Sequence, residues 1–186
     1  MNVQLEPRMD KTEFLAWVQG HEGRYELVGN HVVMMTGGSR GHAILVRRLA
    51  AALEKRLDSS RWTVLTSDFG VDVGPSTVRY PDVVVDVAGG RFKDLTATAP
   101  VLIAEISPSS AKDDLGAKAE EYLRLPSLSA YLVLAQDEPR ARVWGRGAGG
   151  FSPEPEVLDG HDAVIEIGSL GIDVLLAEIY AGVERQ

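Results

Sequence analysis

The segments Tyr80–Val87, YPDVVVDV, and Val101–Ile106, VLIAEI, are rich in β-branched residues and almost continuously apolar. Runs of this kind are typical of strands that are buried on both faces in the middle of a sheet. Asp82 lies in the first run and Glu105 in the second. A charge buried in a core strand is costly unless a cation or a hydrogen-bond network stabilises it, or unless its pKa rises.

Each carboxylate has a simple structural explanation when it is taken alone. Asp82 opens its strand after Pro81, and Glu105 reaches the exposed end of its strand. Two carboxylates on adjacent core strands favour a shared site instead, because converging carboxylate oxygens suit Mg²⁺ or Mn²⁺. We therefore interpret Asp82 and Glu105 as a candidate pair of metal ligands.

The flanking sequence predicts an α/β fold in which helices flank a central mixed sheet. Apolar spacing and capping residues predict three helices: residues 10–20, from Ser39 to about residue 57, and from Ser109 or Ser110 to about residue 125. Further strands are expected at residues 24–28, 31–35, 62–65, 69–73, 130–135 and 140–144. The first two of these form an N-terminal hairpin at the turn Gly29-Asn30.

The C-terminal part of the chain contains two segments of different character. Residues 145–156 are rich in Gly and Pro and are expected to form a loop. Residues 170–180 are apolar with helical spacing and are expected to form a closing element. The sequence shows no internal repeat and no linker, so we expect residues 1–186 to form a single domain.

Three further polar residues lie where apolar residues are expected. Lys118 and His42 fall on the apolar stripes of their predicted helices, and Glu26 lies in a short strand among apolar neighbours. Ordinary explanations are that the Lys118 ammonium reaches solvent, that His42 is a hydrogen-bonded core residue, and that Glu26 pairs with an arginine. The alternative is that Lys118 and Glu26 join the acidic pair, with His42 contacting substrate or bracing the site.

The formal net charge of −8, from 19 basic and 27 acidic residues, opposes binding to a polyanion. A nucleic-acid enzyme of this charge needs a local basic patch, or metal ions that neutralise an acidic site. The sequence has one basic cluster, for which a solvated helix face is the simpler explanation. Its members are Arg40, Arg47, Arg48, Lys55, Arg56 and Arg61.

The chain contains no cysteine, which excludes disulfides and cysteine nucleophiles and agrees with a reducing compartment. The N-terminus does not have the pattern of a signal peptide, and the apolar runs are too short to cross a bilayer. We therefore expect a cytoplasmic protein with no membrane partner. The sequence has no HExxH, Walker-type, GxGxxG or GxSxG motif, which argues against zinc, nucleotide-loop and serine-hydrolase chemistry.

An ordered set of motifs runs from about Tyr25 to Trp144. It comprises Tyr25-Glu26-Leu27, Ser39 and His42, Tyr80-Pro81-Asp82, Glu105-Ile106-Ser107-Pro108-Ser109-Ser110, Asp113 or Asp114, Lys118 and Tyr122. This set resembles the Uma-type restriction endonucleases, which belong to the PD-(D/E)xK, or restriction-endonuclease-like, nuclease superfamily. The Pro-Asp dipeptide alone is a weak signal, whereas the ordered set is fairly specific.

The resemblance implies a restriction-endonuclease-like core in which acidic residues bind Mg²⁺ or Mn²⁺ and a lysine supports the attacking water. The residues carried over are Glu26, Asp82, Glu105 and Lys118 for catalysis, and Asp82, Glu105 and the Ile106 carbonyl for the metal. The superfamily places its lysine two residues after the glutamate, but this chain has Ser107 there. Lys118 would therefore supply the ammonium from the next helix. His42 and Ser107 are candidates for contacting substrate.

We therefore expect a metal-dependent endonuclease that hydrolyses DNA phosphodiester bonds. Two alternatives stay open at this point. The acidic charge and the displaced lysine favour an inactive nuclease fold that serves as a DNA-binding or protein-interaction module, and a small nucleotide substrate would ease the charge problem. Enzymes that cut both strands often act as two-fold dimers. A homodimer is thus a further expectation, with residues 170–180 as its interface unless they pack on their own core.

Overall fold

A seven-stranded mixed sheet forms the centre of the structure, a computed structural model that describes residues 8–108 and 115–183. Its strands are β3 Trp62–Thr66, β6 Val83–Val87, β7 Leu102–Ser107, β8 Ala130–Ala135, β9 Arg140–Gly147, β10 Gly150–Phe151 and β11 Glu156–Asp159. They run in the order β10-β9-β8-β7-β6-β3, and β11 also pairs with β9. β7 and β8 are parallel, and the other pairs in this sheet are antiparallel. The predicted central mixed sheet is confirmed.

The middle strands of this sheet are the apolar runs of the sequence. Every residue of β7 and β8 is buried, as are the first four residues of β6. β6 and β7 are antiparallel neighbours with Val83 opposite Ala104. Asp82 directly precedes β6, so it is next to Glu105 at one end of this strand pair. The register therefore brings the two carboxylates to the same place in the sheet.

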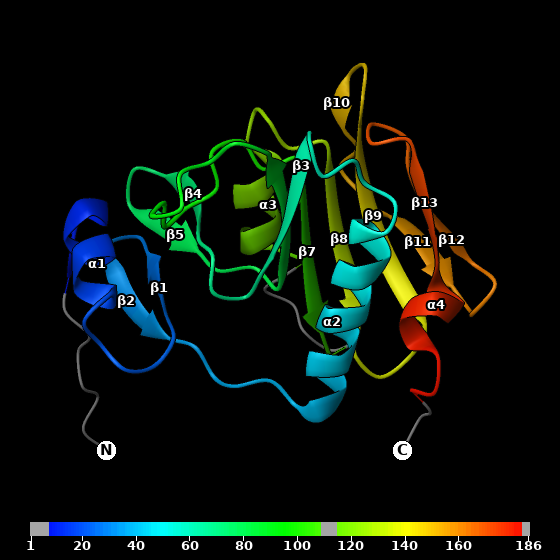
Figure 1. Cartoon of the computed structure of the whole chain (residues 1–186), viewed down its shortest axis with the longest axis horizontal. Helices are drawn as coiled ribbons and strands as arrows, with labels where there is room; N and C mark the ends of the chain where they lie inside the picture. The colour runs from blue at the N-terminus through cyan, green and yellow to red at the C-terminus, as the bar shows by residue number, and fades with distance from the viewer. Residues whose placement is uncertain (1–7, 109–114, 184–186) are drawn as a thin grey trace.

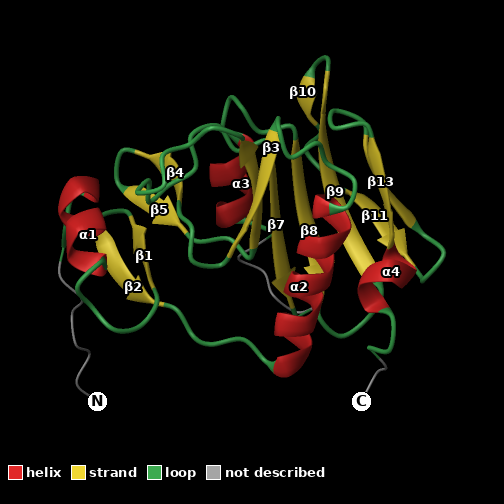
Figure 2. Cartoon of the chain, in the orientation of Figure 1, coloured by secondary structure: helices red, strands yellow, loops and turns green. Residues whose placement is uncertain are grey.

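Helices cover both faces of the large sheet (Figure 1; Figure 2). They are α2 Arg40–Glu54, α3 Ala117–Leu123 and α4 Leu176–Tyr180, whereas α1 Lys11–Val18 packs on a smaller sheet. α2 and α4 lie on one face, where Leu45, Leu49 and Leu53 enter the main core. α3 lies on the other face and contributes Tyr122 to a second core. Fully burying one such leucine side chain contributes about 1.5–3 kcal/mol to stability. Apolar packing is therefore the main interaction that holds α2 on the sheet.

A smaller antiparallel sheet lies beside the large one and packs against α1. Its strands are β1 Tyr25–Val28, β2 His31–Met34, β4 Val71–Gly74 and β5 Thr77–Arg79, in the order β2-β1-β5-β4. Gly29 and Asn30 join β1 to β2 with φ values of 56° and 68°, the left-handed conformation that a two-residue hairpin turn requires. Asp10 forms a capping box with Glu13 at the start of α1.

The expectation for residues 170–180 is only partly correct. The first half of this segment is β13 Ile172–Leu175, which forms a hairpin with the preceding strand β12 Val164–Ile167, and α4 is only five residues long. Burial alternates along β13, because Ile172 and Val174 face the core while Asp173 and Leu175 face outward. This period of two fits a strand better than a helix. The buried side chains of α4 pack in the main core of the chain itself, so they are not available to a partner.

The loop expected at residues 145–156 contains more regular structure than its composition predicts. β9 continues to Gly147, turns back as β10, and the chain then enters β11 at Glu156. The two residues proposed to cap the third helix, Ser109 and Ser110, lie outside the described residues. Within the described ranges, no helix is long and apolar enough to cross a membrane.

Candidate active site

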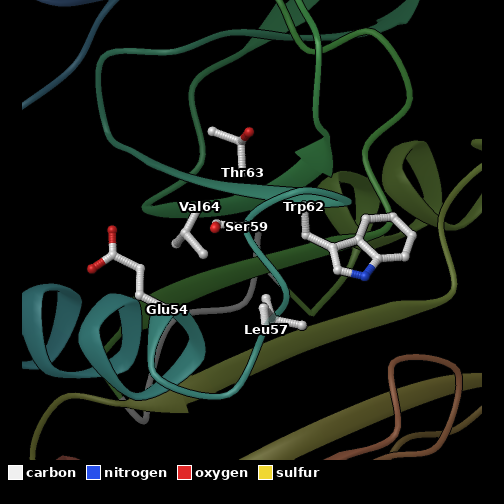
Figure 3. A pocket seen from close by; sticks show the side chains of 6 residues that line it. All are labelled: Glu54, Leu57, Ser59, Trp62, Thr63 and Val64. Carbon is white, nitrogen blue, oxygen red and sulfur yellow. The ribbon is translucent and has the colours of Figure 1, made fainter.

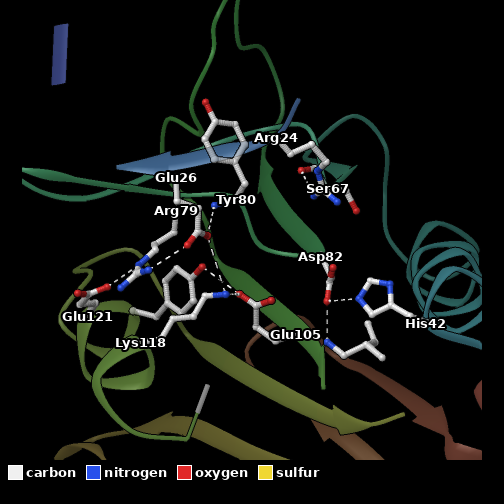
Figure 4. Close-up of polar contacts among 12 residues, drawn as sticks. Arg24, Glu26, His42, Ser67, Arg79, Tyr80, Asp82, Glu105, Lys118 and Glu121 are labelled. Carbon is white, nitrogen blue, oxygen red and sulfur yellow. Dashed lines mark hydrogen bonds and ion pairs between the residues drawn. The ribbon is translucent and has the colours of Figure 1, made fainter. Parts of the chain in front are cut away.

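The predicted site residues meet where the small sheet joins the large one (Figure 4). Asp82 lies on the connection from β5 to β6, and Glu105 lies on β7. Both are buried, with 8% and 4% of their surfaces exposed. Glu26 of β1 and Ser107 of β7 are also buried. Because buried carboxylates are rare unless they are paired or bound to a cation, this grouping distinguishes the region from the rest of the core.

Asp82 is held by one backbone group and one side chain. Its Oδ2 atom accepts a hydrogen bond from the Ile106 backbone N–H at 2.8 Å. The same oxygen lies 3.0 Å from His42 Nε2 on α2. Within the described residues both of these contacts fall on Oδ2. The Ile106 carbonyl points to the same side of β7 as its N–H, because both groups of one residue in a strand share a side.

His42 reaches Asp82 because α2 begins close to the site. Ser39 caps this helix, and its Oγ accepts a hydrogen bond from the His42 backbone N–H at 3.1 Å. A Cβ atom at Gly38 would lie 2.5 Å from His42 Nδ1, so the ring fits in its place only because residue 38 is glycine. The hydrogen bond to Asp82 raises the pKa of His42 above 6.5 despite partial burial, and the negative charge of Glu105 raises it further.

Glu105 is held by two side chains of α3. Lys118 Nζ lies 2.8 Å from Glu105 Oε1, and the Tyr122 hydroxyl donates a hydrogen bond to the same oxygen at 3.1 Å. Complete burial raises the pKa of Tyr122 well above its ordinary value, and the nearby Glu105 carboxylate adds to this effect. The Lys118 side chain is 14% exposed, so the ammonium turns inward to the carboxylate and not outward to solvent.

Glu26 has the arginine partner that its ordinary explanation requires, and it also faces the acidic pair. Its Oε2 atom accepts a hydrogen bond from Arg79 at 2.9 Å, and its Oε1 atom accepts one from the Tyr80 backbone N–H at 3.0 Å. Lys118 Nζ lies 4.0 Å from the same Oε1 atom, so this lysine lies between Glu26 and Glu105. The two explanations offered for Glu26 are thus compatible.

Sequence reasoning did not find Arg79 and Glu121. Arg79 Nε donates to Glu121 Oε2 at 2.8 Å while its other nitrogen contacts Glu26, so it connects α3 to the small sheet. Burial lowers the pKa of Arg79, but the carboxylates of Glu121 and Glu26 outweigh this effect and raise it. The available signal was an arginine directly before Tyr80-Pro81-Asp82, but β5 is too short to show a recognisable strand pattern.

The charges of these described side chains do not balance. Glu26, Asp82, Glu105 and Glu121 carry four negative charges, whereas Arg79 and Lys118 carry two positive charges. Among these described side chains the carboxylates therefore outnumber the basic groups by two, and a divalent cation bound beside them would offset this negative charge. Two carboxylates, one backbone carbonyl and several waters are an ordinary environment for Mg²⁺. The residues present therefore fit a divalent metal.

Not every residue of the predicted set is placed as a ligand. Among residues 8–108 and 115–183, no three His, Asp or Glu side chains converge into a ready-made metal-binding group. Asp113 and Asp114 lie outside the described residues. Ser107 ends β7 on the same face as Glu105, two residues on, and its carbonyl accepts a hydrogen bond from the Gln136 backbone N–H at 2.8 Å.

Two cavities lie along α2. The first, called here the α2 groove, has a volume of about 430 Å³ and is lined by one face of α2 together with Arg24, Thr66 and Ser67. It includes His42 and therefore borders Asp82. The second, of about 310 Å³, lies between the end of α2 and β3 and is lined by Leu57 and Trp62 among others (Figure 3).

The mixed sheet, the helices on both faces and the buried acidic cluster define an α/β protein of the restriction-endonuclease-like class. A solved structure from Anabaena variabilis ATCC 29413, described as "a putative nuclease belonging to DUF820", superposes with a TM-score of 0.74 over 93% of this chain and 98% of that chain, at 15% identity. The family model Uma2, described as "Putative restriction endonuclease", matches residues 12–174. The chain belongs to this family. The uncharacterized protein slr1290 of Synechocystis sp. is 25% identical over 182 residues, which cover 95% of this chain and 93% of that protein.

Proposed function

We propose that this protein is a metal-dependent endonuclease that hydrolyses phosphodiester bonds in DNA. The observation that carries the proposal is the position of Asp82, directly before β6, next to Glu105 on the neighbouring strand β7, with Lys118 Nζ 2.8 Å from Glu105. Membership of a family described as restriction endonucleases supports the reaction class. The excess of carboxylates over basic groups among the described side chains of the site supports the dependence on a divalent cation.

Each residue of the proposed site has a distinct role. Asp82, Glu105 and the Ile106 carbonyl would hold Mg²⁺ or Mn²⁺, which when bound supplies positive charge beside the scissile phosphate and makes a nearby water more acidic. Lys118 orients the attacking water and offsets negative charge that develops on the phosphate. As this water attacks phosphorus, a new P–O bond forms and the bond to the leaving sugar oxygen breaks in line with it. The water gives up a proton, and the leaving sugar oxygen takes one up to become a hydroxyl.

The remaining predicted residues support this centre. Glu26 holds Lys118 from the side opposite Glu105 and is itself fixed by Arg79. His42 fixes Asp82 and faces the α2 groove, where it is placed to contact substrate. Ser107 occupies the lysine position of the superfamily and contacts substrate next to Glu105. We further propose that residues 1–186 act as one domain, and that the protein works in the cytoplasm.

The central test is cleavage of supercoiled plasmid and labelled oligonucleotides with Mg²⁺ or Mn²⁺. Asp82→Asn and Glu105→Gln remove ligand charge while keeping side-chain shape, so we expect cleavage to fall to background with the fold intact by circular dichroism. Asp58→Asn is the matched control, since Asp58 is an exposed aspartate whose carboxylate accepts hydrogen bonds from Ser60, outside the proposed site. Cleavage at the wild-type rate by both site variants would refute the assignment.

One observation favours a second candidate function, a nuclease fold that binds DNA without cutting it. The lysine position two residues after Glu105 holds Ser107, and a relocated Lys118 has to supply the ammonium. Under this alternative the wild-type protein binds oligonucleotides but leaves them intact with every divalent metal tested. Single-stranded DNA, RNA and free nucleotides assayed beside the plasmid separate this outcome from a preference for another substrate.

Cleavage of both strands of a duplex by one such site requires either two copies of the chain or two successive reactions. We propose a two-fold homodimer that places one site on each strand. Light scattering of the purified protein, alone and with duplex DNA, measures the number of copies. A monomer in both conditions, with nicked circles accumulating before linear plasmid, would contradict the dimer.

A further inference from the structure

The α2 groove is continuous with the proposed metal site. Two of its lining residues contact Asp82 directly. His42 Nε2 lies 3.0 Å from the Asp82 carboxylate, and the Ser67 backbone N–H donates to the Asp82 carbonyl at 3.1 Å. Figure 4 shows Arg24 and Ser67 next to Asp82 and His42, on the side of Asp82 away from Lys118. A polymer cut at the metal site can therefore extend into this groove without crossing the core.

The charged side chains of the groove are mostly positive on the part near Asp82. Arg24 and Arg47 line the groove, and both side chains carry a positive charge. Arg24 donates a hydrogen bond to the Ser67 carbonyl at 2.8 Å, which holds its guanidinium at the rim. Its 3.6 Å ion pair is with Asp68, whose side chain is 90% exposed, and such a pair contributes little against a bound phosphate. The local charge thus differs from the net charge of −8.

Two other arginines of the basic cluster, Arg48 on α2 and Arg56 just after it, make different contacts. Arg48 donates hydrogen bonds to the carbonyls of Ile179 and Ala181. Arg56 forms a bidentate ion pair with the Glu178 carboxylate. These two arginines hold α4 against α2. The basic cluster of the sequence is therefore divided, because Arg47 faces the groove whereas Arg48 and Arg56 stabilise the fold.

The shape of the groove also fits a chain of phosphates. Ala43, Arg47, Ala50 and Ala51 share one face of α2, since they are spaced by three or four residues. Alanines leave room for a backbone to approach the helix, with Arg47 between them. Glu54 lies at the far end of the groove, where its charge disfavours a further phosphate. The cavity near Trp62 has Glu54 as the one charged residue among its described lining residues, so it does not attract a polyanion.

We infer that the α2 groove holds the sugar–phosphate backbone of the nucleic-acid strand beside the scissile bond, with Arg47 and Arg24 contacting its phosphates. The inference rests on the proposed nuclease function, which it extends by assigning a path to the substrate. Arg47 and Arg24 are positioning residues. They bind phosphates that do not react, and their effect is on affinity and on its dependence on salt.

The test measures binding apart from cleavage. Fluorescence anisotropy follows a labelled 20-nucleotide single strand, and its duplex, in buffer with Ca²⁺ in place of Mg²⁺, with intact DNA verified on a gel. Arg47→Glu should weaken binding by about tenfold or more and lower the slope of log affinity against log salt by about one unit. Arg91→Glu is the matched control, because Arg91 is an exposed arginine beyond the opposite end of β6 and should stay within about twofold of wild type.

The outcomes separate the groove from the proposed function. The inference about the groove is overturned if Arg47→Glu and Arg91→Glu lose equal affinity for DNA, or if the wild-type protein does not bind DNA. Weakened binding by Arg47→Glu, with wild-type protein that cuts no plasmid, supports the groove and refutes the nuclease. Arg47→Ala is a second variant that controls for misfolding. Its melting temperature should equal that of the wild type, and its loss of DNA affinity should be smaller than that of Arg47→Glu.

Discussion

The position of Lys118 in the chain differs from that of the superfamily lysine, but its ammonium still lies beside Glu105. In the superfamily pattern the lysine follows the glutamate by two residues on one strand, whereas Lys118 lies 13 positions after Glu105, on α3. The structure brings its Nζ atom to 2.8 Å from Glu105 Oε1 and 4.0 Å from Glu26 Oε1. What matters for catalysis is where the ammonium lies, and a helix packed on the strand can supply it as well as the strand itself.

Replacing Lys118 tests whether this ammonium acts in the reaction or only in the fold. We expect Lys118→Met to lower the cleavage rate by about 100-fold or more, because a positioned donor near developing charge is removed. Binding of Mn²⁺, measured by calorimetry, should persist, since Asp82 and Glu105 are intact. Lys118→Arg should recover part of the rate.

Lys93→Met is the control for loss of a lysine, because Lys93 is exposed in the loop after β6. A Lys118→Met protein that loses metal binding together with activity would contradict the proposed role. It would show instead that Lys118 supports the structure of the acidic pair.

The C-terminal elements show how a short helix contributes beyond its own stability. α4 has five residues, too few to be stable in isolation. It is fixed by Tyr180, whose hydroxyl donates to the carbonyl of Ala135 at 2.5 Å and lies 3.2 Å from that of Arg140. These two carbonyls bound the turn between β8 and β9. α4 therefore anchors the turn between β8 and β9 as well as α2.

Tyr180→Phe should lower the free energy of unfolding by about 1–2 kcal/mol, because a buried carbonyl loses its donor. Urea unfolding followed by fluorescence measures the change. Tyr25→Phe removes a hydroxyl that donates to the Glu22 carbonyl in an exposed region, and it should cost about 0.5 kcal/mol or less. Equal effects of the two substitutions would mean that the Tyr180 hydroxyl does not anchor α4.

The candidate site depends on the assembly of both sheets. Glu26 and Arg79 come from the small sheet, Asp82 from the connection between the sheets, and Glu105 from the large sheet. In the unfolded chain Asp82 and Glu105 are separated by 22 residues and do not form a joint site. A cation that binds both therefore binds the folded protein far better than the unfolded chain, and it adds to stability.

Mn²⁺ at about 100 times its dissociation constant should stabilise the wild-type protein by about 2.7 kcal/mol. For a chain of this length we expect a rise in melting temperature of about 5–10 °C, measured by differential scanning fluorimetry. Glu105→Gln should abolish most of this rise, whereas Asp58→Asn should keep it. An equal rise in all three proteins would place the cation outside the proposed site.

Much of the fold follows from local patterns. The apolar runs around Asp82 and Glu105 predict two central strands, and the structure has them as neighbours. Ser39 and Asp10 mark helix starts that the structure confirms. These signals work because burial on both faces and helix capping each depend on a few consecutive residues. They therefore identify the buried carboxylates before any contact is known.

Contacts between distant residues are a different matter. β11 is largely exposed, and burial alternates along β13, so neither strand is an apolar run in the sequence. Both strands form because a partner strand lies beside them. Arg47 and Arg48 look alike in the sequence, yet one faces the groove and the other binds α4. The pairing of Arg79 with Glu26 joins residues 53 positions apart. Such pairings depend on how the two sheets and the helices pack in space, and a periodicity of two or 3.6 residues along the chain carries no information about that packing.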